Sequence, residues 1–258
     1  AQYSGLALAL YFAMKYYGKV ILRHLDIRGS LQLTALKGFF KVNSDIFLRT
    51  VCLVAVFTCI TSFSGKISDE VLAIDALLLQ FFTLFSYIMD GFAYAGESLV
   101  GRYIGAKDPT SLHKTIRQLI LWGLASVVTF TALYATGDRW ILSWFTDKEQ
   151  LIEATHQYLP WVLAIPICGF SAFLFDGIYV GATASRQMRN SMFVATACFF
   201  AIYYYQWINL ESMKGIATDT EYNNALWLAF MVFLTMRGIM QALLLRKAVY
   251  SQIPPADA

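Results

Sequence analysis

Long apolar stretches separated by short polar segments dominate the chain. Three of them contain no Asp, Glu, Lys or Arg: residues 118–137, 154–175 and 190–210, which are 20, 22 and 21 residues long. A helix of about 20 apolar residues crosses the roughly 30 Å hydrocarbon core of a bilayer. The pattern therefore predicts membrane-spanning helices.

Further apolar stretches are long enough to span a membrane if each may contain a few charged residues. The seven predicted spans lie near residues 3–23, 36–63, 71–101, 118–136, 157–182, 191–209 and 223–245. The longest connection, residues 138–156, carries Trp and Leu side chains that predict helical turns on the outer surface. We therefore predict an all-α integral membrane protein that forms one bundle of seven transmembrane helices.

Composition agrees with this prediction. Hydrophobic residues make up 58% of the 258 residues and charged residues 14%, and the mean hydropathy is +0.53. Soluble domains have about 25% charged residues. A formal net charge of +3, scattered through apolar sequence, leaves no basic patch for a nucleic-acid partner.

The distribution of Lys and Arg predicts the orientation in the membrane. Thirteen of these residues lie on the side to which the first span leads, and only four lie on the opposite side. Cytoplasmic loops are enriched in Lys and Arg. We expect a multi-pass protein of the inner (plasma) membrane, with the N-terminus of this chain outside and its C-terminus in the cytoplasm.

Ionisable side chains at membrane depth are the most informative residues. A charge there is costly and normally faces a cavity, a partner or an ion path. The six such residues are Lys15, Asp45, Arg49, Asp90, Glu97 and Asp176.

Two of these acids share one helix face. Asp90 and Glu97 are seven residues apart, so they lie within about 20° of each other around the helix. A ladder of two carboxylates is what a proton or cation path needs. Asp176 has no base within a helical turn, so its carboxyl group is a candidate proton carrier.

A structural role is the alternative for several charged residues. Asp45 and Arg49 have the i,i+4 spacing that allows an acid and a base to neutralise each other along one helix. Asp75 lies near the outer edge of its span, and Lys15 can extend to the membrane interface. We expect structural roles for these last two.

No enzyme is expected. His24, His113 and His156 lie in loops or at span ends, and none belongs to a catalytic or nucleotide-binding motif. Neither a metal site nor a cofactor is predicted.

Three segments resemble DinF-type members of the multidrug and toxic compound extrusion (MATE) family. Residues 34–50, TALKGFFKVNSDIFLRT, are similar to the seventh helix of that family. Residues 87–101, YIMDGFAYAGESLVG, are similar to the eighth. Residues 175–183, FDGIYVGAT, are similar to the tenth.

The resemblance implies an architecture. The family has twelve helices in two six-helix lobes, with the substrate cavity between the lobes. Residues 1–24 would then be the sixth helix, residues 25–35 a cytoplasmic linker between the lobes, residues 36–247 the six-helix C-terminal lobe and residues 248–258 a cytoplasmic tail. Helices one to five, the rest of the N-terminal lobe, would lie outside this sequence, in the same chain or a partner chain.

The resemblance also implies a function. The family exports cationic or amphipathic compounds in exchange for H⁺ or Na⁺ by alternating access. Asp176 falls where cation-site members carry an acid, and Asp90 and Glu97 would share ion or proton coupling with it. Arg49, Asp45 and Asn43 would form the polar network around them. Because Arg49 stands where some members have a glutamate, the resemblance favours H⁺ over Na⁺.

Two alternatives remain open at the level of sequence. Seven spans also fit a receptor or a light-driven protein, although span seven has Arg237 and no Lys for a retinal Schiff base. A flippase-like subunit for lipid-linked substrates, or a structural membrane subunit, is the second alternative.

Overall fold

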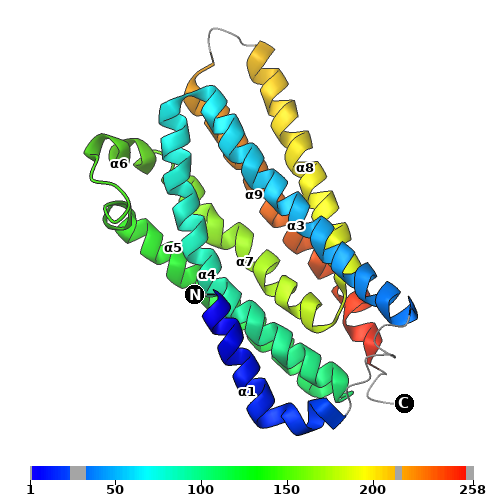
Figure 1. Ribbon diagram of the computed structural model, residues 1–258. Helices are drawn as coiled ribbons and strands as arrows, with labels where there is room; N and C mark the ends of the chain where they lie inside the picture. The colour runs from blue at the N-terminus through cyan, green and yellow to red at the C-terminus, as the bar shows by residue number, and fades with distance from the viewer. Residues whose placement is uncertain (1, 24–32, 213–216, 254–258) are drawn as a thin grey trace. The chain divides into compact units, whose positions relative to one another are not determined.

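The computed structural model describes residues 2–23, 33–212 and 217–253 (Figure 1). The helices are α1 (Gln2–Arg23), α3 (Leu33–Ile67), α4 (Asp69–Gly105), α5 (Pro109–Leu142), α6 (Glu149–His156), α7 (Leu159–Gly181), α8 (Ser185–Ser212), α9 (Asp219–Ala248) and the short 3-10 helix η1 (Tyr250–Gln252). The chain divides into two compact units, residues 1–44 and 45–258. Most of the predicted linker and the end of the predicted tail lie outside the described residues, so the predicted domain boundaries stay a prediction.

The smaller unit contains α1 and the first turns of α3. Helix α1 covers the first predicted span and carries four tyrosines and Lys15. It is not among the described helices that are long and apolar enough to cross a membrane, so this span stays a prediction. The Lys15 Nζ atom lies 5.7 Å and 5.8 Å from the ring centroids of Tyr11 and Tyr16.

The other six predicted spans coincide with long apolar helices. Among the described residues, α3, α4, α5, α7, α8 and α9 are each long and apolar enough to cross a membrane. The structure therefore confirms an all-α membrane protein. The helical turns predicted in the connection 138–156 are also confirmed, since α6 lies there.

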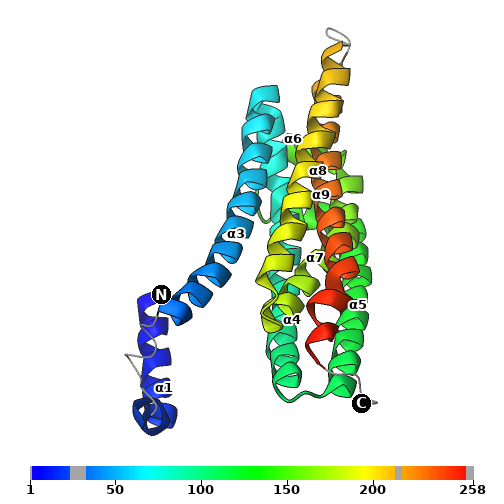
Figure 2. The same cartoon turned by 90° about the vertical axis from the view of Figure 1, so that its right-hand side faces the viewer.

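Helix α7 is the most buried of these six. In its most apolar window 56% of the residues are buried, against 11% for α3 and 17% for α5. The most extensive contacts join α4 to α7 and α8 to α9, and α7 also packs on α9. Figures 1 and 2 show these helices side by side. Helix α7 therefore holds its polar residues at the centre of the bundle.

Two glycines of α7 set the distance between α7 and α4. A Cβ atom at Gly177 would overlap the carbonyl oxygen of Ala93, and one at Gly181 would overlap the carbonyl oxygen of Glu97. Small residues four apart allow helix backbones in a membrane to approach closely. The sequence Gly-xxx-Gly at 177–181 thus fixes the α4–α7 contact next to Asp176.

Side-chain caps define where three helices begin. Ser68 caps α4, Asp108 caps α5, and Thr218 forms a capping box with Glu221 at the start of α9. Hydrogen bonds from Ser111 hold the pKa of the Asp108 carboxyl below its ordinary value. The Asp108 cap is therefore fully present above the ordinary pKa of Asp and is lost as the pH falls through the lowered value.

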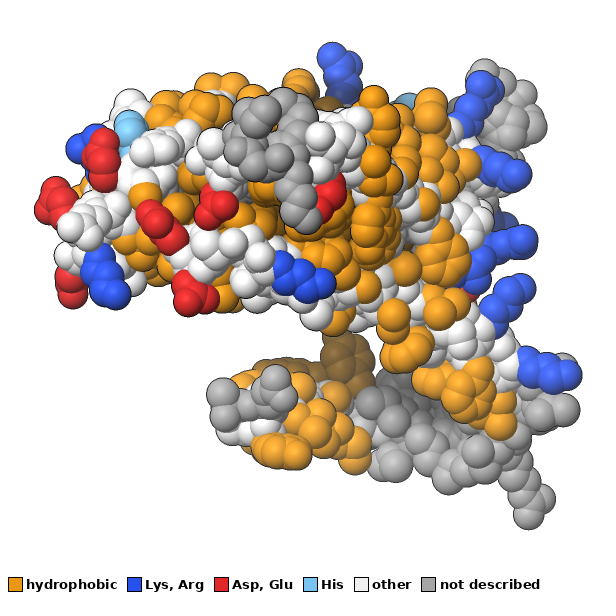
Figure 3. Space-filling view, turned by 90° about the horizontal axis from the view of Figure 1, so that it is seen from above, with side chains coloured by type: hydrophobic (Ala, Val, Ile, Leu, Met, Phe, Trp, Pro, Cys, Tyr) orange, Lys and Arg blue, Asp and Glu red, His pale blue; other side chains and the backbone are white. Residues whose placement is uncertain are grey.

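Charged side chains lie apart from the apolar surface. Figure 3 shows acidic groups gathered on one side of the view, a row of Lys and Arg side chains on the opposite side, and hydrophobic surface between them. Exposed apolar residues include Trp122, Val128 and Leu243. Exposed apolar surface of this kind is what a helix bundle presents to lipid.

Candidate functional site

Asp176 of α7 is the centre of a cluster that joins three helices. Arg49 of α3 and Arg237 of α9 both donate hydrogen bonds to its Oδ2 atom. Gln241 of α9 donates from Nε2 to Oδ1 at 2.7 Å. The side chains of Asp176 and Arg237 are only 13% and 3% exposed. Asp176 has no base within a helical turn of its own helix, as predicted, but arginines of two other helices pair with it, and its role as a proton carrier stays a prediction.

Helix α9 presents its two donors from successive turns. Arg237 and Gln241 have the i,i+4 spacing that places side chains on one helix face. Between them, a Cβ atom at Gly238 would overlap Ser171 of α7, so only glycine allows this approach of α9 to α7. The Tyr179 hydroxyl of α7 donates to the Gln241 carbonyl oxygen at 2.6 Å. These contacts hold the donors against Asp176.

A second ion pair attaches α3 to α8. Asp45 is 4% exposed and accepts hydrogen bonds from Arg189 and, at 3.2 Å, from the Ser185 hydroxyl. Ser185 and Arg189 are again one turn apart on their helix. Asp45 is therefore a buried and fully paired acid.

The prediction of an i,i+4 ion pair between Asp45 and Arg49 is wrong. Asp45 pairs with Arg189, and Arg49 pairs with Asp176. An ion pair along a helix surface contributes only about 0.2–0.5 kcal/mol. Buried partners on neighbouring helices, in surroundings of lower dielectric constant, attract each side chain more strongly. The two residues connect α3 to two different helices.

The acids of α4 are placed differently from each other. Asp90 is half-buried and lies close enough for its charge to act on both Arg49 and Arg237. Glu97 is exposed, and no ion pair connects it to the cluster within the described residues. The structure thus brings Asp90, but not Glu97, into electrostatic range of the Asp176 cluster.

Asn43 makes a local contact. Its side-chain Nδ2 atom donates to the Phe39 carbonyl oxygen at 2.8 Å, within α3. Asn43 belongs to the unit formed by residues 1–44, so its proposed place in the polar network stays a prediction.

Four partners in the two clusters were not among the predicted site residues: Arg237, Gln241, Arg189 and Ser185. Arg237 carried a signal, because it is a charge inside an apolar stretch and Gln241 follows one turn later. Arg189 lies at the end of a predicted span, where a basic side chain is expected on topological grounds. Its pairing required the three-dimensional arrangement.

The charges of the Asp176 cluster balance only when Asp90 is counted. Two guanidinium groups against one carboxylate leave one positive charge, and Asp90 supplies the second negative charge. The buried Nε atoms of Arg49 and Arg237 have no hydrogen-bond acceptor among the described residues. Guanidinium donors stabilise the ionised form of a carboxylate. A proton that binds Oδ2 of Asp176 must therefore compete with the two arginines, whereas Oδ1 accepts a hydrogen bond from Gln241 only.

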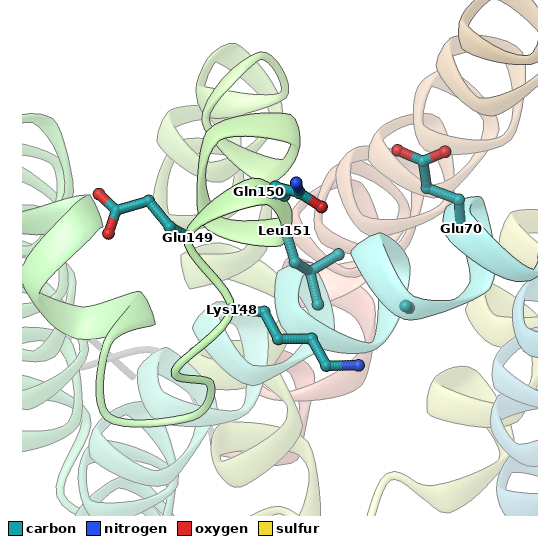
Figure 4. Close-up of a pocket in the computed structure, with 6 residues that line it drawn as sticks. Glu70, Lys148, Glu149, Gln150 and Leu151 are labelled. Atoms are coloured by element: carbon teal, nitrogen blue, oxygen red, sulfur yellow. The ribbon is translucent and has the colours of Figure 1, made fainter.

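A surface pocket of about 550 Å³ lies elsewhere, between the first turns of α4 and the start of α6 (Figure 4). Its lining includes Glu70, Lys148 and Glu149, and Figure 4 shows the Glu149 carboxylate pointing away from Glu70. None of the residues of the Asp176 and Asp45 clusters lines it. The pocket is not part of the candidate site.

Comparisons with known proteins agree on one family. The MatE family model matches residues 46–221. DNA damage-inducible protein F of Escherichia coli (strain K12) is 32% identical over 251 residues, which are 96% of this chain and 51% of that protein. Protein DETOXIFICATION 42 of Arabidopsis thaliana is 24% identical over 204 residues, 78% of this chain and 37% of that protein. The chain spans about half the length, or less, of these two relatives.

Proposed function

Because the chain belongs to the MatE family of membrane transporters, we propose that it is the C-terminal half of a multidrug efflux antiporter. In this proposal the complete transporter exports cationic or amphipathic compounds in exchange for protons by alternating access. In this proposal, helices equivalent to the first five of the family complete the cavity. The family membership and the DinF-like relative support a transporter over a receptor or a light-driven protein.

The observation that carries the proposal is the Asp176 cluster. Asp176 lies within α7, one of the apolar helices, and it binds side chains from α3 and α9. A carboxylate shared by three helices responds to protonation by weakening its bonds to all of them. Proton binding at Asp176 would thereby favour a different arrangement of α3 against α7 and α9.

Arg49 is the reason to propose H⁺ and not Na⁺ as the coupling ion. Its guanidinium group occupies Asp176 Oδ2, where a sodium ion would need an oxygen ligand. A fixed positive charge at that atom repels a metal cation. A proton requires only one oxygen atom and can be taken up when Arg49 moves away.

Asp90 and Glu97 are proposed to share ion or proton coupling with Asp176. Neither makes an ion pair within the described residues, whereas Asp45 and Asp176 are already paired. We also propose that the protein lies in the inner membrane. In the proposed orientation the N-terminus of this chain is outside and its C-terminus is in the cytoplasm.

The experiment is efflux of a cationic dye from vesicles that contain the complete transporter polypeptide, driven by an imposed pH gradient. The substitution Asp176→Asn keeps the size of the side chain but removes its charge, and we expect it to abolish pH-driven efflux without loss of expression. Asp147→Asn changes an exposed acid outside the helices and serves as the matched control. Undiminished efflux by Asp176→Asn contradicts the proposal.

A sodium gradient at constant pH separates the two coupling ions. Proton coupling predicts no efflux under this condition, in the wild type or in the control variant. Efflux that follows the sodium gradient would show that the coupling ion is Na⁺.

A further inference from the structure

Asp75 of α4 is more deeply buried than any acid of the Asp176 cluster. It is 1% exposed and lies where α3, α4 and α9 meet. Its partners are the Ser64 hydroxyl, the Asn223 side-chain amide at 3.0 Å and the Trp227 indole N–H at 2.7 Å. All three are neutral groups. Asp75 thus differs from Asp45 and Asp176, which both bind arginine.

The two carboxyl oxygens of Asp75 have different surroundings. Oδ1 accepts two N–H bonds, from Asn223 and Trp227. Oδ2 contacts only the Ser64 hydroxyl, which also lies 2.8 Å from the Ile60 carbonyl oxygen. One oxygen is therefore placed as an acceptor and the other faces a hydroxyl group.

The single hydrogen of the Ser64 hydroxyl determines which hydrogen bonds can form between Asp75, Ser64 and Ile60. A hydroxyl group has one hydrogen to donate and can also accept. It cannot donate to both Ile60 and an ionised Asp75. If Asp75 carries a proton on Oδ2, that O–H donates to Ser64, and Ser64 donates to Ile60. Every contact is then satisfied and no charge is buried.

The cost of burying a charge also favours a proton on Asp75. An ionised carboxylate out of water is costly unless a charged partner compensates it. We propose that Asp75 is a proton-binding site of its own, occupied by a proton in this conformation, with Ser64 as the acceptor of that proton's hydrogen bond.

Other charged or titratable side chains lie near the helix ends that surround Asp75. The exposed ones are Lys66 on α3, Asp69 and Glu70 on α4, Lys148 and Glu149 at the start of α6, and Asp219 and Glu221 on α9. None of these is a hydrogen-bonding partner of Asp75 within the described residues. On α8, Tyr203 is buried and stacks on Phe63 of α3. Among the residues that the structure describes, no Lys or Arg side chain forms an ion pair with Asp75.

Asp75 is distinct from the Asp176 site. Ala93, which contacts the backbone at Gly177 beside Asp176, lies 18 residues further along α4, a rise of about 27 Å. Loss of the proton would leave a bare charge between α3, α4 and α9 and would favour their separation at this end. The inference concerns proton binding alone and does not depend on the transported compound.

Infrared spectroscopy of the complete transporter in lipid tests the proposal. A protonated carboxylic acid has a C=O stretching band that ionised carboxylates lack, and an exposed Asp is ionised near neutral pH. We expect Asp75→Asn to remove one such band at neutral pH. Asp69→Asn, an exposed acid one and a half turns away, should leave the band in place.

Two further variants keep the test decisive if Asp75→Asn fails to fold. Trp227→Phe removes an N–H donor from Oδ1 and should move the C=O band to higher frequency. Ser64→Ala removes the acceptor of the O–H group and should shift the same band. A spectrum in which the folded variants neither lose nor shift a protonated-acid band overturns the proposal.

Discussion

Arg49 and Arg237 donate to the same oxygen atom of one carboxylate group, Oδ2 of Asp176. The two arginines come from α3 and α9, so one acid lies between two positive charges that would otherwise repel each other, and Asp90 supplies the second negative charge. Either arginine alone could neutralise Asp176. Because both guanidinium groups bind the same carboxylate, loss of Asp176 would deprive both of them of this partner at once.

Arg237→Met should destabilise the bundle by up to about 3–5 kcal/mol, the cost of breaking a buried ion pair, with the lower end expected because Arg49 still binds Asp176. The measurement is the free energy of unfolding in detergent. Arg246→Met, an exposed arginine on the same helix, is the control and should have little effect. In the double variant Arg237→Met/Asp176→Asn the two losses should be less than additive. Strict additivity would show that the two residues are not coupled.

Exchanging the charges of Asp45 and Arg189 tests the α3–α8 ion pair. Asp45→Arg alone places two arginines together and should reduce the amount of folded protein in the membrane. The double variant Asp45→Arg/Arg189→Asp restores opposite charges and should recover part of that loss. Size-exclusion chromatography of the detergent-extracted protein measures the recovery. No recovery would mean that the pairing contributes nothing to folding.

Gly177→Ala tests the close contact of α7 with α4. The added methyl group meets the Ala93 backbone, which cannot move aside as a side chain can, so we expect a loss of at least about 1–3 kcal/mol of unfolding free energy. Gly169→Ala on the same helix is the matched control. Its Cβ would lie 3.6 Å from Phe173 and Phe85, an ordinary contact distance, so the change should be close to neutral. Equal effects at both positions would contradict the account.

Tyr179→Phe removes the hydroxyl group that donates to the Gln241 carbonyl oxygen. We expect a loss of about 1 kcal/mol of unfolding free energy, the typical contribution of one hydrogen bond. Tyr205→Phe, at a residue that is 66% exposed, should not change stability. Thermal unfolding of both variants under one set of detergent conditions provides the comparison, and a stable Tyr179→Phe would show that this bond is dispensable.

Hydrophobic patterning was sufficient to find the six long helices, because a spanning helix needs a continuous apolar stretch that charges rarely interrupt. Asp176 and Arg49 could be singled out for the same reason, as costly charges in such stretches. The first predicted span coincides with helix α1, but its crossing of a membrane stays a prediction.

Pairing between helices could not be derived from the sequence. The i,i+4 spacing of Asp45 and Arg49 suggested a local ion pair, but both side chains reach across to other helices. Arg189 of α8 reaches Asp45 of α3 across the bundle, a contact that no spacing along the chain reveals. Asp75 was expected to be merely structural, and its surroundings become informative only when Ser64, Asn223 and Trp227 are seen to converge on it.

The first half of the part of α3 that lies in the larger unit is attached through polar side chains, whereas Val56 and Ile60 bury apolar surface further along the helix. Little of its apolar surface is covered, whereas Asp45 and Arg49 bind α8 and α7 from positions one turn apart. A small rotation of α3 about its own axis would carry both side chains away from their partners at the same moment. Because both ion pairs start from one face of α3, a rotation of the helix would strain them together.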